Sequence, residues 1–419
     1  MSVDDSSYSR VLSYPTFTEM EAILKEDFEI LASQMEYGMP TFLYRWKRKG
    51  SMNPESTEAF IERYRDDSEQ EPTAQVRIGN VPDPEVQREV FERIHKRSKD
   101  LKVWPIIRWK DKEEGIYYTR FIPEERQPKS DTRINKALFI ATLASIALGG
   151  FLQASSEVFL ALFYPQGYTI WDVIFTTGIF MLALMGIIGT HEMGHYQMAK
   201  HRGIEATPPY FIPGLPQIGG TFGAFIQQKS PPKNRSDLLD LGLAGPYAGF
   251  IVTVIALVIG FLMSVPVTAE QIAAIDAAYP NMSGSLEVPL LFNLLEFLFV
   301  GFIPEGGTIY LHPVGFAAWV GCLVTALNLF PAGQLDGGHA LRAIMDEKIH
   351  KYVGYGAMIV MFIVGFWLMA ILVFALSSGA GHPGALDDTV PVSKSRILLF
   401  VLAMIVLVIS IPPLTLSFF

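Results

Sequence analysis

The feature that most constrains this chain is a series of long hydrophobic segments in its last two thirds. A helix needs about 20 consecutive apolar residues to span the roughly 30 Å hydrocarbon core of a bilayer. Segments of this kind occur at 136–160, 172–200, 241–264, 313–331, 353–377 and 397–416. A further apolar stretch, 287–303, is interrupted by Glu287 and Glu296, which indicates an interfacial or re-entrant helix. We therefore expect a polytopic α-helical membrane protein with about six transmembrane helices.

Charged residues are concentrated before about residue 135, although they make up only 18% of the 419 residues. This asymmetry predicts a soluble domain over 1–133 and a transmembrane domain over 134–419. Three helix starts are expected in the front domain: a capping box at Thr16 and Glu19, and an N-cap followed by proline at Asn53-Pro54 and at Asp83-Pro84. The first helix should include the apolar positions Met20, Ile23, Leu24, Phe28 and Leu31.

Two runs at the end of the front domain, 102–109 and 115–122, have the composition of strands and flank a charged turn. The front is thus predicted to be a small α/β domain that binds a partner or regulates, since no catalytic pattern occurs in it. The formal net charge of −9 argues against a nucleic-acid partner. The short basic cluster at Arg45 and 47–49 is interpreted as a solvated face rather than a lipid or RNA site.

The distribution of lysine and arginine indicates how the chain crosses the membrane, because short cytoplasmic loops carry the positive charge. The loop after the second predicted span and the segment after the fourth are basic, whereas 161–171 and 265–312 contain no Lys or Arg. This pattern favours six spans with both termini in the cytoplasm. Lys394 and Arg396 lie on the wrong side in this scheme.

The second predicted span ends in Thr190-His191-Glu192-Met193-Gly194-His195. Positions i and i+4 lie on one face of a helix, so both imidazoles can reach one metal ion. Glu192 is then placed to activate water rather than to bind the metal. Ionisable groups at membrane depth are expensive and usually functional. The alternative is a hydrogen-bonded structural cluster beyond the end of the membrane helix.

A catalytic zinc ion needs a third protein ligand and an open position. The charge-poor back half offers Asp336, which follows Pro331 and Gly333 at the end of the fourth span. Both residues should break the helix there, and irregular backbone at membrane depth is tolerated only where it is buried or lines a cavity. In the charge-derived topology the second and fourth spans both end in the cytoplasm, so Asp336 and the histidines can meet at one depth.

The pattern His191-Glu192-x-x-His195, combined with Asn328-x-x-Pro331-x-x-x-Leu335-Asp336-Gly337, resembles the site-2 protease family of intramembrane zinc metallopeptidases. The resemblance covers roughly 136–416. The segments 209–213 and 219–225 are similar to the branch that contains the chloroplast proteins of the gravitropism-deficient, yellow-green type and their prokaryotic relatives.

The resemblance implies roles for particular residues. His191, His195 and Asp336 match the ligands of one zinc ion, and Glu192 matches the general base. Asn328 matches the family asparagine, whose amide would help to hold the substrate or the oxyanion. His339 is either a group that supports Asp336 or a polar residue at a helix start.

Two further segments have open interpretations. Thr221, Phe222 and Gly223 begin a strand-like run, 221–226, that would hold an unwound substrate by strand addition, or would form an ordinary hairpin over the site. Gly242, Gly245 and Gly249 with Pro246 form either a helix-packing face or a kink that shapes substrate access.

The expected function is hydrolysis of peptide bonds in membrane-spanning substrate helices, in a lipid bilayer. A catalytically silent relative that binds or chaperones membrane helices is the alternative. A metal transporter is disfavoured because its polar ligands would be spread along several spans. The polar first fifteen residues predict neither a signal peptide nor an organelle transit peptide, so a prokaryotic cell membrane is the expected location.

Overall fold

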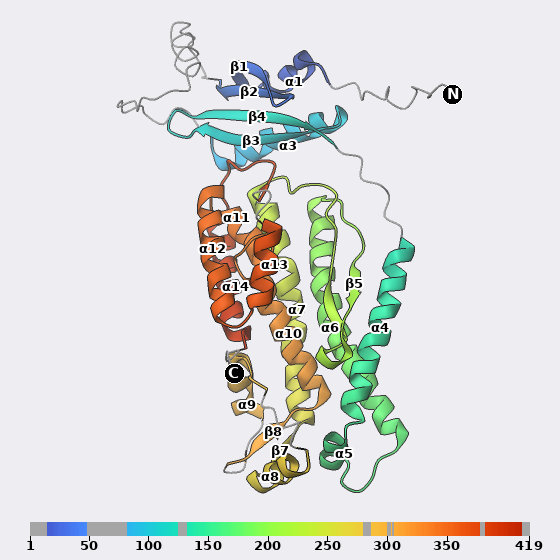
Figure 1. The fold of residues 1–419 in the computed structure, drawn as a ribbon. Helices are drawn as coiled ribbons and strands as arrows, with labels where there is room; N and C mark the ends of the chain where they lie inside the picture. Colours follow the sequence, from blue (N-terminus) through green and yellow to red (C-terminus); the bar gives the residue numbers. More distant parts are fainter. Residues whose placement is uncertain are drawn as a thin grey trace, which may run out of the picture. The chain divides into compact units, whose positions relative to one another are not determined.

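The computed structural model describes residues 15–47, 82–124, 132–279, 286–299, 303, 306–377 and 382–412. The chain divides into two compact units (Figure 1). The first, here called the sheet domain, contains the residues up to 128 together with two short later segments, 232–235 and 385–391. The second, here called the helical domain, contains the rest of the chain. The two later segments of the sheet domain were not part of the predicted front domain.

The sheet domain contains one antiparallel sheet with the strand order β1-β2-β4-β3. Its elements are α1 (Phe17–Leu24), β1 (Phe28–Glu36), β2 (Met39–Trp46), α3 (Pro84–Asp100), β3 (Val103–Asp111) and β4 (Ile116–Pro123). The predicted capping box at Thr16 and the N-cap at Asp83 are confirmed, and so are the two predicted strands. The helix expected from Asn53-Pro54 lies outside the described residues.

The prediction that Phe28 and Leu31 continue the first helix is wrong. Helix α1 ends at Leu24, and both residues belong to β1. Strand β1 pairs with β2 through a two-residue turn in which Tyr37 and Gly38 both have positive φ, at 52° and 75°. Such turns match the twist of a hairpin. The aromatic and β-branched side chains of β2 favour a strand partner, so tertiary pairing outweighs the local helical spacing.

The outer edge of β3 is covered by residues 385–389 rather than left open. The amide of Ile107 donates to the carbonyl of Leu386 at 2.8 Å, and the amide of Asp388 donates back to Ile107 at 3.2 Å. The Leu386 side chain is 3% exposed and packs in the hydrophobic core of the sheet domain. Because unpaired strand edges invite association, this pairing protects the β3 edge.

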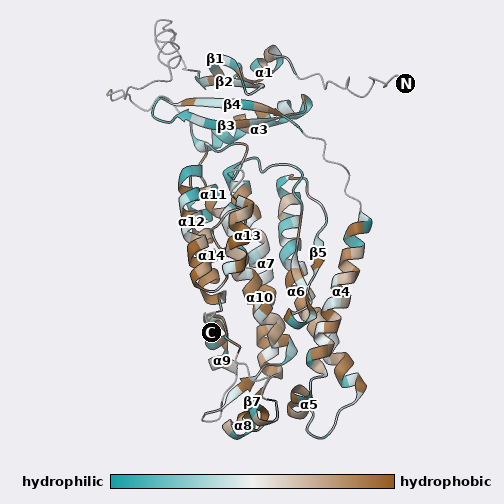
Figure 2. Ribbon diagram, viewed as in Figure 1, coloured by the Kyte–Doolittle hydropathy of each residue, from teal (hydrophilic) through white to brown (hydrophobic). Residues whose placement is uncertain are grey.

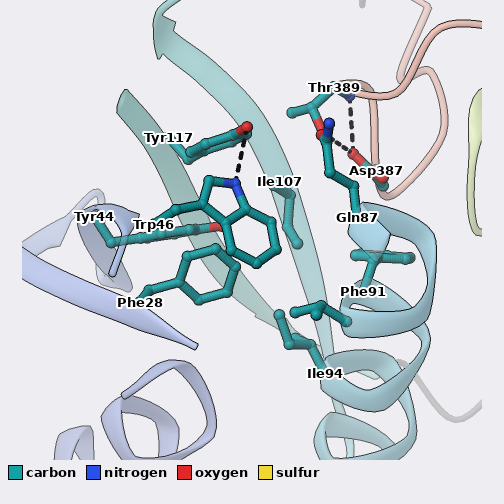
Figure 3. Close-up of a pocket in the computed structure, with 11 residues that line it drawn as sticks. Phe28, Tyr44, Trp46, Gln87, Phe91, Ile94, Ile107, Tyr117, Asp387 and Thr389 are labelled. Carbon is teal, nitrogen blue, oxygen red and sulfur yellow. Dashed lines mark hydrogen bonds between the residues drawn. The ribbon is translucent and has the colours of Figure 1, made fainter. Parts of the chain in front are cut away.

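A small cavity lies between the sheet and α3, lined by aromatic side chains and by Asp387 (Figure 3). Oδ1 of Asp387 accepts bonds from the amide and the hydroxyl of Thr389, and the Trp46 indole donates to the Tyr117 hydroxyl. The cavity volume is about 20 Å³. That is the room of about one water molecule, so this cavity is too small for an organic ligand.

The helical domain contains the hydrophobic segments. Among the described residues, the helices long and apolar enough to cross a membrane are α4 (Thr132–Ala154), α6 (Ile170–Arg202) and α7 (Arg235–Met263). They agree with the first three predicted spans, except that α4 ends at Ala154, before the predicted bound at 160. Figure 2 shows hydrophobic residues along much of α4 and α7, and α6 becoming hydrophilic toward its C-terminal end. Helix α10 (Pro313–Leu329) is apolar but shorter, so about six crossings remains a prediction.

The prediction of one span over 353–377 is wrong. This segment forms a helical hairpin of α12 (Glu347–Ile363) and α13 (Trp367–Ser377), which lie side by side (Figure 1). The chain turns at Gly365, which has a φ of 97° that favours glycine. Gly354 and Ser377 both lie against Gly333, so the two ends of the segment meet at one place.

The hairpin removes the anomaly of Lys394 and Arg396. Helix α14 (Lys394–Ser410) begins at the end of the helical domain where Arg396 and Arg202 both contact Asp240. We call this the Arg202 end. From there α14 runs toward α9 (Leu290–Phe299), which lies nearer the opposite end (Figure 1). The expected return of the C-terminus to the Arg202 side is therefore not supported.

The opposite end of the helical domain is closed by short elements. These are α5 (Glu157–Phe163), β7 (Val265–Val267), α8 (Ala269–Ala278) and β8 (Thr308–Tyr310). His312 caps α10 there: its Nδ1 accepts a bond from the Val314 amide at 3.2 Å. His312 is 3% exposed, and its ring lies edge-on against the stacked rings of Phe159 and Phe163. Burial lowers the pKa of His312 to about 4.

Acidification should destabilise the short elements around His312 at this end of the helical domain. The folded-state pKa of His312 lies below the ordinary value near 6.5, so the unfolded chain binds the proton more readily. Stability should therefore fall as the pH drops from about 6.5 to about 4, by at most about 3 kcal/mol. The check is the thermal unfolding midpoint of wild type and His312→Asn, an N-cap that does not titrate. Equal slopes against pH in the two proteins would contradict this expectation, because the other histidines titrate in both.

Candidate metal centre

Helix α6 presents His191, Glu192 and His195 as buried side chains near its C-terminal end. The helix starts with a capping box between Thr169 and Asp172 and ends at Gly203, which has a left-handed backbone. The two histidines lie one helical turn apart, and their Nε2 atoms approach to 3.2 Å. The predicted sharing of one face is therefore what the structure shows.

Asp336 reaches the same place from the start of α11 (Asp336–Ile344). Helix α10 ends at Leu329, and the chain turns tightly through Pro331 and Gly333, where φ is 55°. This irregular segment directs Asp336 Oδ2 to 3.1 Å from His195 Nε2 and 3.2 Å from His191 Nε2. The helix break that the sequence suggested is thus the feature that carries Asp336 to the histidines.

The ligand atoms form a nearly equilateral triangle with edges of 3.1 to 3.2 Å. Four ligands held tetrahedrally at about 2.0–2.1 Å from zinc are about 3.3 Å apart. The triangle therefore matches three corners of a zinc tetrahedron and leaves the fourth corner for water or substrate. Two imidazoles and one carboxylate are also a donor set that zinc prefers. The residues present fit a zinc ion.

The orientation of the His195 ring is fixed by a hydrogen bond on the side away from the triangle. Its Nδ1 lies 2.8 Å from the carbonyl oxygen of Leu241, in α7. A carbonyl only accepts, so the ring proton is on Nδ1 and the Nε2 lone pair faces the triangle. Glu192 is 5% exposed and makes no hydrogen bond to another described residue, which leaves its carboxylate free to act on a small molecule. Nδ1 of His191 is buried without a partner among the described residues.

The glycines of α7 are the reason that the histidines fit. A Cβ on Gly245 would lie 2.6 Å from His195 Cε1, and one on Gly249 would lie 3.2 Å from His191 Nδ1. A Cβ on Gly242 would lie 2.8 Å from the backbone oxygen of Asp336. Each glycine thus packs against one residue of the triangle. These contacts support the interpretation of the small residues of α7 as a helix-packing face.

The predicted strand over 221–226 is present as β6 (Thr221–Phe225), paired with β5 (Tyr210–Pro213). Thr221 is 7% exposed; its hydroxyl donates to the Ile212 carbonyl and accepts from the Gly223 amide. Phe222 is 62% exposed, and Gly223 has open space where a Cβ would stand. Thr221 therefore supports the hairpin, whereas Phe222 and Gly223 face outward.

The remaining predicted residues lie near the break after α10. Asn328 is half-buried in the last turn of α10. His339 lies in the first turn of α11, where its Nδ1 accepts a bond from His382 Nε2 at 2.7 Å. His382 carries its proton on Nε2 because its Nδ1 accepts from the Gly384 amide. His339 thus ties the start of α11 to the segment that follows α13.

Sequence reasoning missed the carbonyl of Leu241, since a backbone acceptor has no signature in the sequence. The spacing 242, 245 and 249 did signal a small-residue face, but the pattern alone does not say what packs against it. Asp240, which contacts Arg202 and Arg396, was also missed.

Comparison with known proteins agrees with this geometry. Residues 179–372 match the model of Peptidase family M50, a range that includes all three corners of the triangle and Glu192. The probable zinc metalloprotease EGY2, chloroplastic, of Oryza sativa subsp. indica is 33% identical over 216 residues, which are 50% of this chain and 38% of that protein. The probable zinc metalloprotease EGY1, chloroplastic, of Arabidopsis thaliana is 34% identical over 167 residues, 39% of this chain and 29% of that protein.

The chain therefore spans well under half the length of these curated relatives. No solved structure matches it.

Proposed function

Because residues 179–372 match the model of Peptidase family M50, we propose that this protein is an intramembrane zinc metalloprotease of the site-2 protease type. It hydrolyses peptide bonds of membrane-spanning substrate helices. The observation that carries the proposal is the triangle of His191, His195 and Asp336 beside the buried Glu192, on a helix long enough to span a bilayer.

His191, His195 and Asp336 would hold one zinc ion. When bound, zinc supplies Lewis acidity, which polarises the scissile carbonyl and makes water more acidic. Glu192 takes a proton from the attacking water on a carboxylate oxygen and passes it to the leaving nitrogen. The C–N bond breaks, the water oxygen stays on the carbonyl carbon, and a carboxylate and an amine result. Leu241 keeps His195 in the required tautomer during this cycle.

The substrate must be unwound before it is cut, because a membrane helix has all its backbone groups paired internally. Strand β6 offers an edge for this step, since β5 is its only strand partner in the described part of the chain. The open position at Gly223 lets a second backbone approach, and Phe222 would pack on the substrate side chains. Asn328 would hold the substrate or the developing oxyanion through its amide.

The Arg202 end of the helical domain carries the basic loops, so we place it in the cytoplasm, with the metal centre near that side. The location in a prokaryotic cell membrane is part of this proposal. A catalytically silent relative that only binds membrane helices is the second candidate. It would share the metal centre but cleave nothing.

Removing the metal should abolish cleavage reversibly. The assay uses purified full-length protein in detergent and a panel of fluorescently tagged transmembrane peptides, with metal content determined in parallel. Wild type should contain zinc and cleave at least one peptide, lose both properties on treatment with a chelator, and regain both on addition of zinc. His195→Ala should contain little zinc and cleave nothing.

Peptide binding without cleavage by zinc-loaded protein would support the silent relative instead. Absence of zinc from wild type purified with zinc supplied would overturn the ligand assignment.

A further inference from the structure

The carboxylate of Asp240 joins three helices of the helical domain. Asp240 lies in the second turn of α7 and accepts a bond from Nη2 of Arg202, the last residue of α6. It also accepts from Arg396 on α14, through Nε at 2.9 Å and Nη2 at 2.9 Å. The Asp240 side chain is only 10% exposed. A two-pronged, partly buried arginine–carboxylate pair is stronger and more directional than a surface ion pair.

The residues that follow Asp240 form the back wall of the metal centre. The carbonyl of Leu241 accepts the Nδ1 proton of His195 at 2.8 Å. Gly242 lies against the backbone of Asp336, and Gly245 lies against the His195 ring. A small displacement at the start of α7 therefore moves the Leu241 carbonyl, which orients His195. It also moves the glycines that pack against His195 and Asp336.

The two arginines do not contribute equally to the position of this wall. Arg202 belongs to α6, the helix that carries His195, and it also pairs with Asp237, from Nε to Oδ1 at 3.5 Å. Arg396 comes from α14, which carries none of the residues of the metal centre, and it contacts Asp240 with two nitrogens. Arg396 thus holds the Asp240 carboxylate from a helix outside the metal centre, and its two hydrogen bonds fix both the position and the orientation of that carboxylate.

We propose that Arg396 is a positioning residue of the metal centre: through Asp240 it sets the Leu241 carbonyl and hence the orientation of His195. This inference rests on the proposed function only in taking zinc to occupy the triangle of ligand atoms. Mutating a direct hydrogen-bond partner of a metal ligand typically lowers metal affinity by about 10–100-fold. Arg396 acts one step further away, so its removal should lower affinity by roughly tenfold, at the bottom of that range.

The test compares Arg396→Ala, Arg396→Lys and the control Lys394→Ala, each in the full-length chain. Lys394 is exposed, lies two residues earlier on the same helix and carries the same charge. The readouts are zinc retention against a competing chelator and the visible absorption of the cobalt-substituted protein, which reports ligand geometry. Arg396→Ala should show the tenfold loss and a shifted cobalt spectrum. Arg396→Lys keeps the positive charge but not the two-nitrogen contact of the guanidinium, so its zinc affinity should be intermediate. Lys394→Ala should match wild type in both readouts.

Cleavage by the same proteins separates this inference from the proposed function. Where peptides are cleaved, Arg396→Ala should lower kcat and leave KM nearly unchanged. Zinc affinity and cobalt spectra of Arg396→Ala equal to those of Lys394→Ala would overturn the positioning role, whether or not the protein cleaves. The expected metal effects in a protein that cleaves nothing would support the role and count against the protease.

Arg396→Lys and Asp240→Asn provide the same test if Arg396→Ala does not fold. Asp240→Asn should weaken zinc binding in the same direction, because an amide binds the arginine fork less strongly than a carboxylate. Wild-type zinc affinity in both variants would contradict the proposal.

Discussion

Glu192→Gln should abolish cleavage of transmembrane peptides while leaving the bound zinc in place. Glu192 is buried beside the ligand triangle but is not one of its corners, so an amide of the same shape should not disturb metal binding. A glutamine cannot accept the proton of the attacking water, and a positioned general base typically contributes about 10²–10⁴-fold to the rate. The measurement is single-turnover cleavage together with metal content and peptide affinity.

Glu205→Gln is the matched control, because it is the same substitution at an exposed glutamate just after the end of α6. It should behave as wild type. Cleavage within threefold of wild type by zinc-loaded Glu192→Gln would show that another group acts as the base. Loss of zinc from this variant would show that Glu192 takes part in holding the metal.

Gly245→Ala should empty the metal centre by the addition of one methyl group. The new Cβ would lie 2.6 Å from Cε1 of His195 and nearer still to Nε2, so the ring must tilt away from the triangle. Because the ring is held from behind by Leu241, tilting also breaks that hydrogen bond. We expect zinc content to fall from stoichiometric to a small fraction, and cleavage to fall by at least about 100-fold.

The control for this effect is Gly189→Ala, on α6 two residues before His191, where a Cβ would meet nothing within 4 Å. Alanine stabilises a helix relative to glycine by about 1 kcal/mol, so this variant should be as stable as wild type or more so. Zinc bound at the wild-type level by Gly245→Ala would mean that the neighbouring helices separate enough to admit the methyl group.

Much of the metal centre could be predicted because its ligands are side chains at a recognisable spacing in the sequence. The histidines at 191 and 195 share a face by helix geometry alone, and Asp336 is one of few charged residues at membrane depth. The helix break at Pro331 and Gly333 was also visible from residue types. Long helices such as α6 and α7 follow from the need to pair every backbone group within a bilayer.

What the sequence could not show depends on tertiary contacts. The segment 353–377 is as apolar as a true span, and only its packing against Gly333 reveals that it turns back at Gly365. The strand at Phe28 and Leu31 has the spacing of a helix until its partner β2 is considered. Arg396 was an anomaly of the charge distribution; the turn at Gly365 explains its side of the helical domain, and Asp240 is the partner that the sequence did not indicate.

The pairing of residues 385–389 with β3 constrains the order in which the protein can mature during synthesis. The ribosome makes β3 and the rest of the core of the sheet domain first, but Leu386, which completes that core, emerges more than 250 residues after the end of β4. Until then the β3 edge is without the segment that covers it in the finished protein. The sheet domain therefore closes only after α13 has been made, so a nascent chain arrested before residue 385 should be more susceptible to proteases and chaperones there than the completed chain.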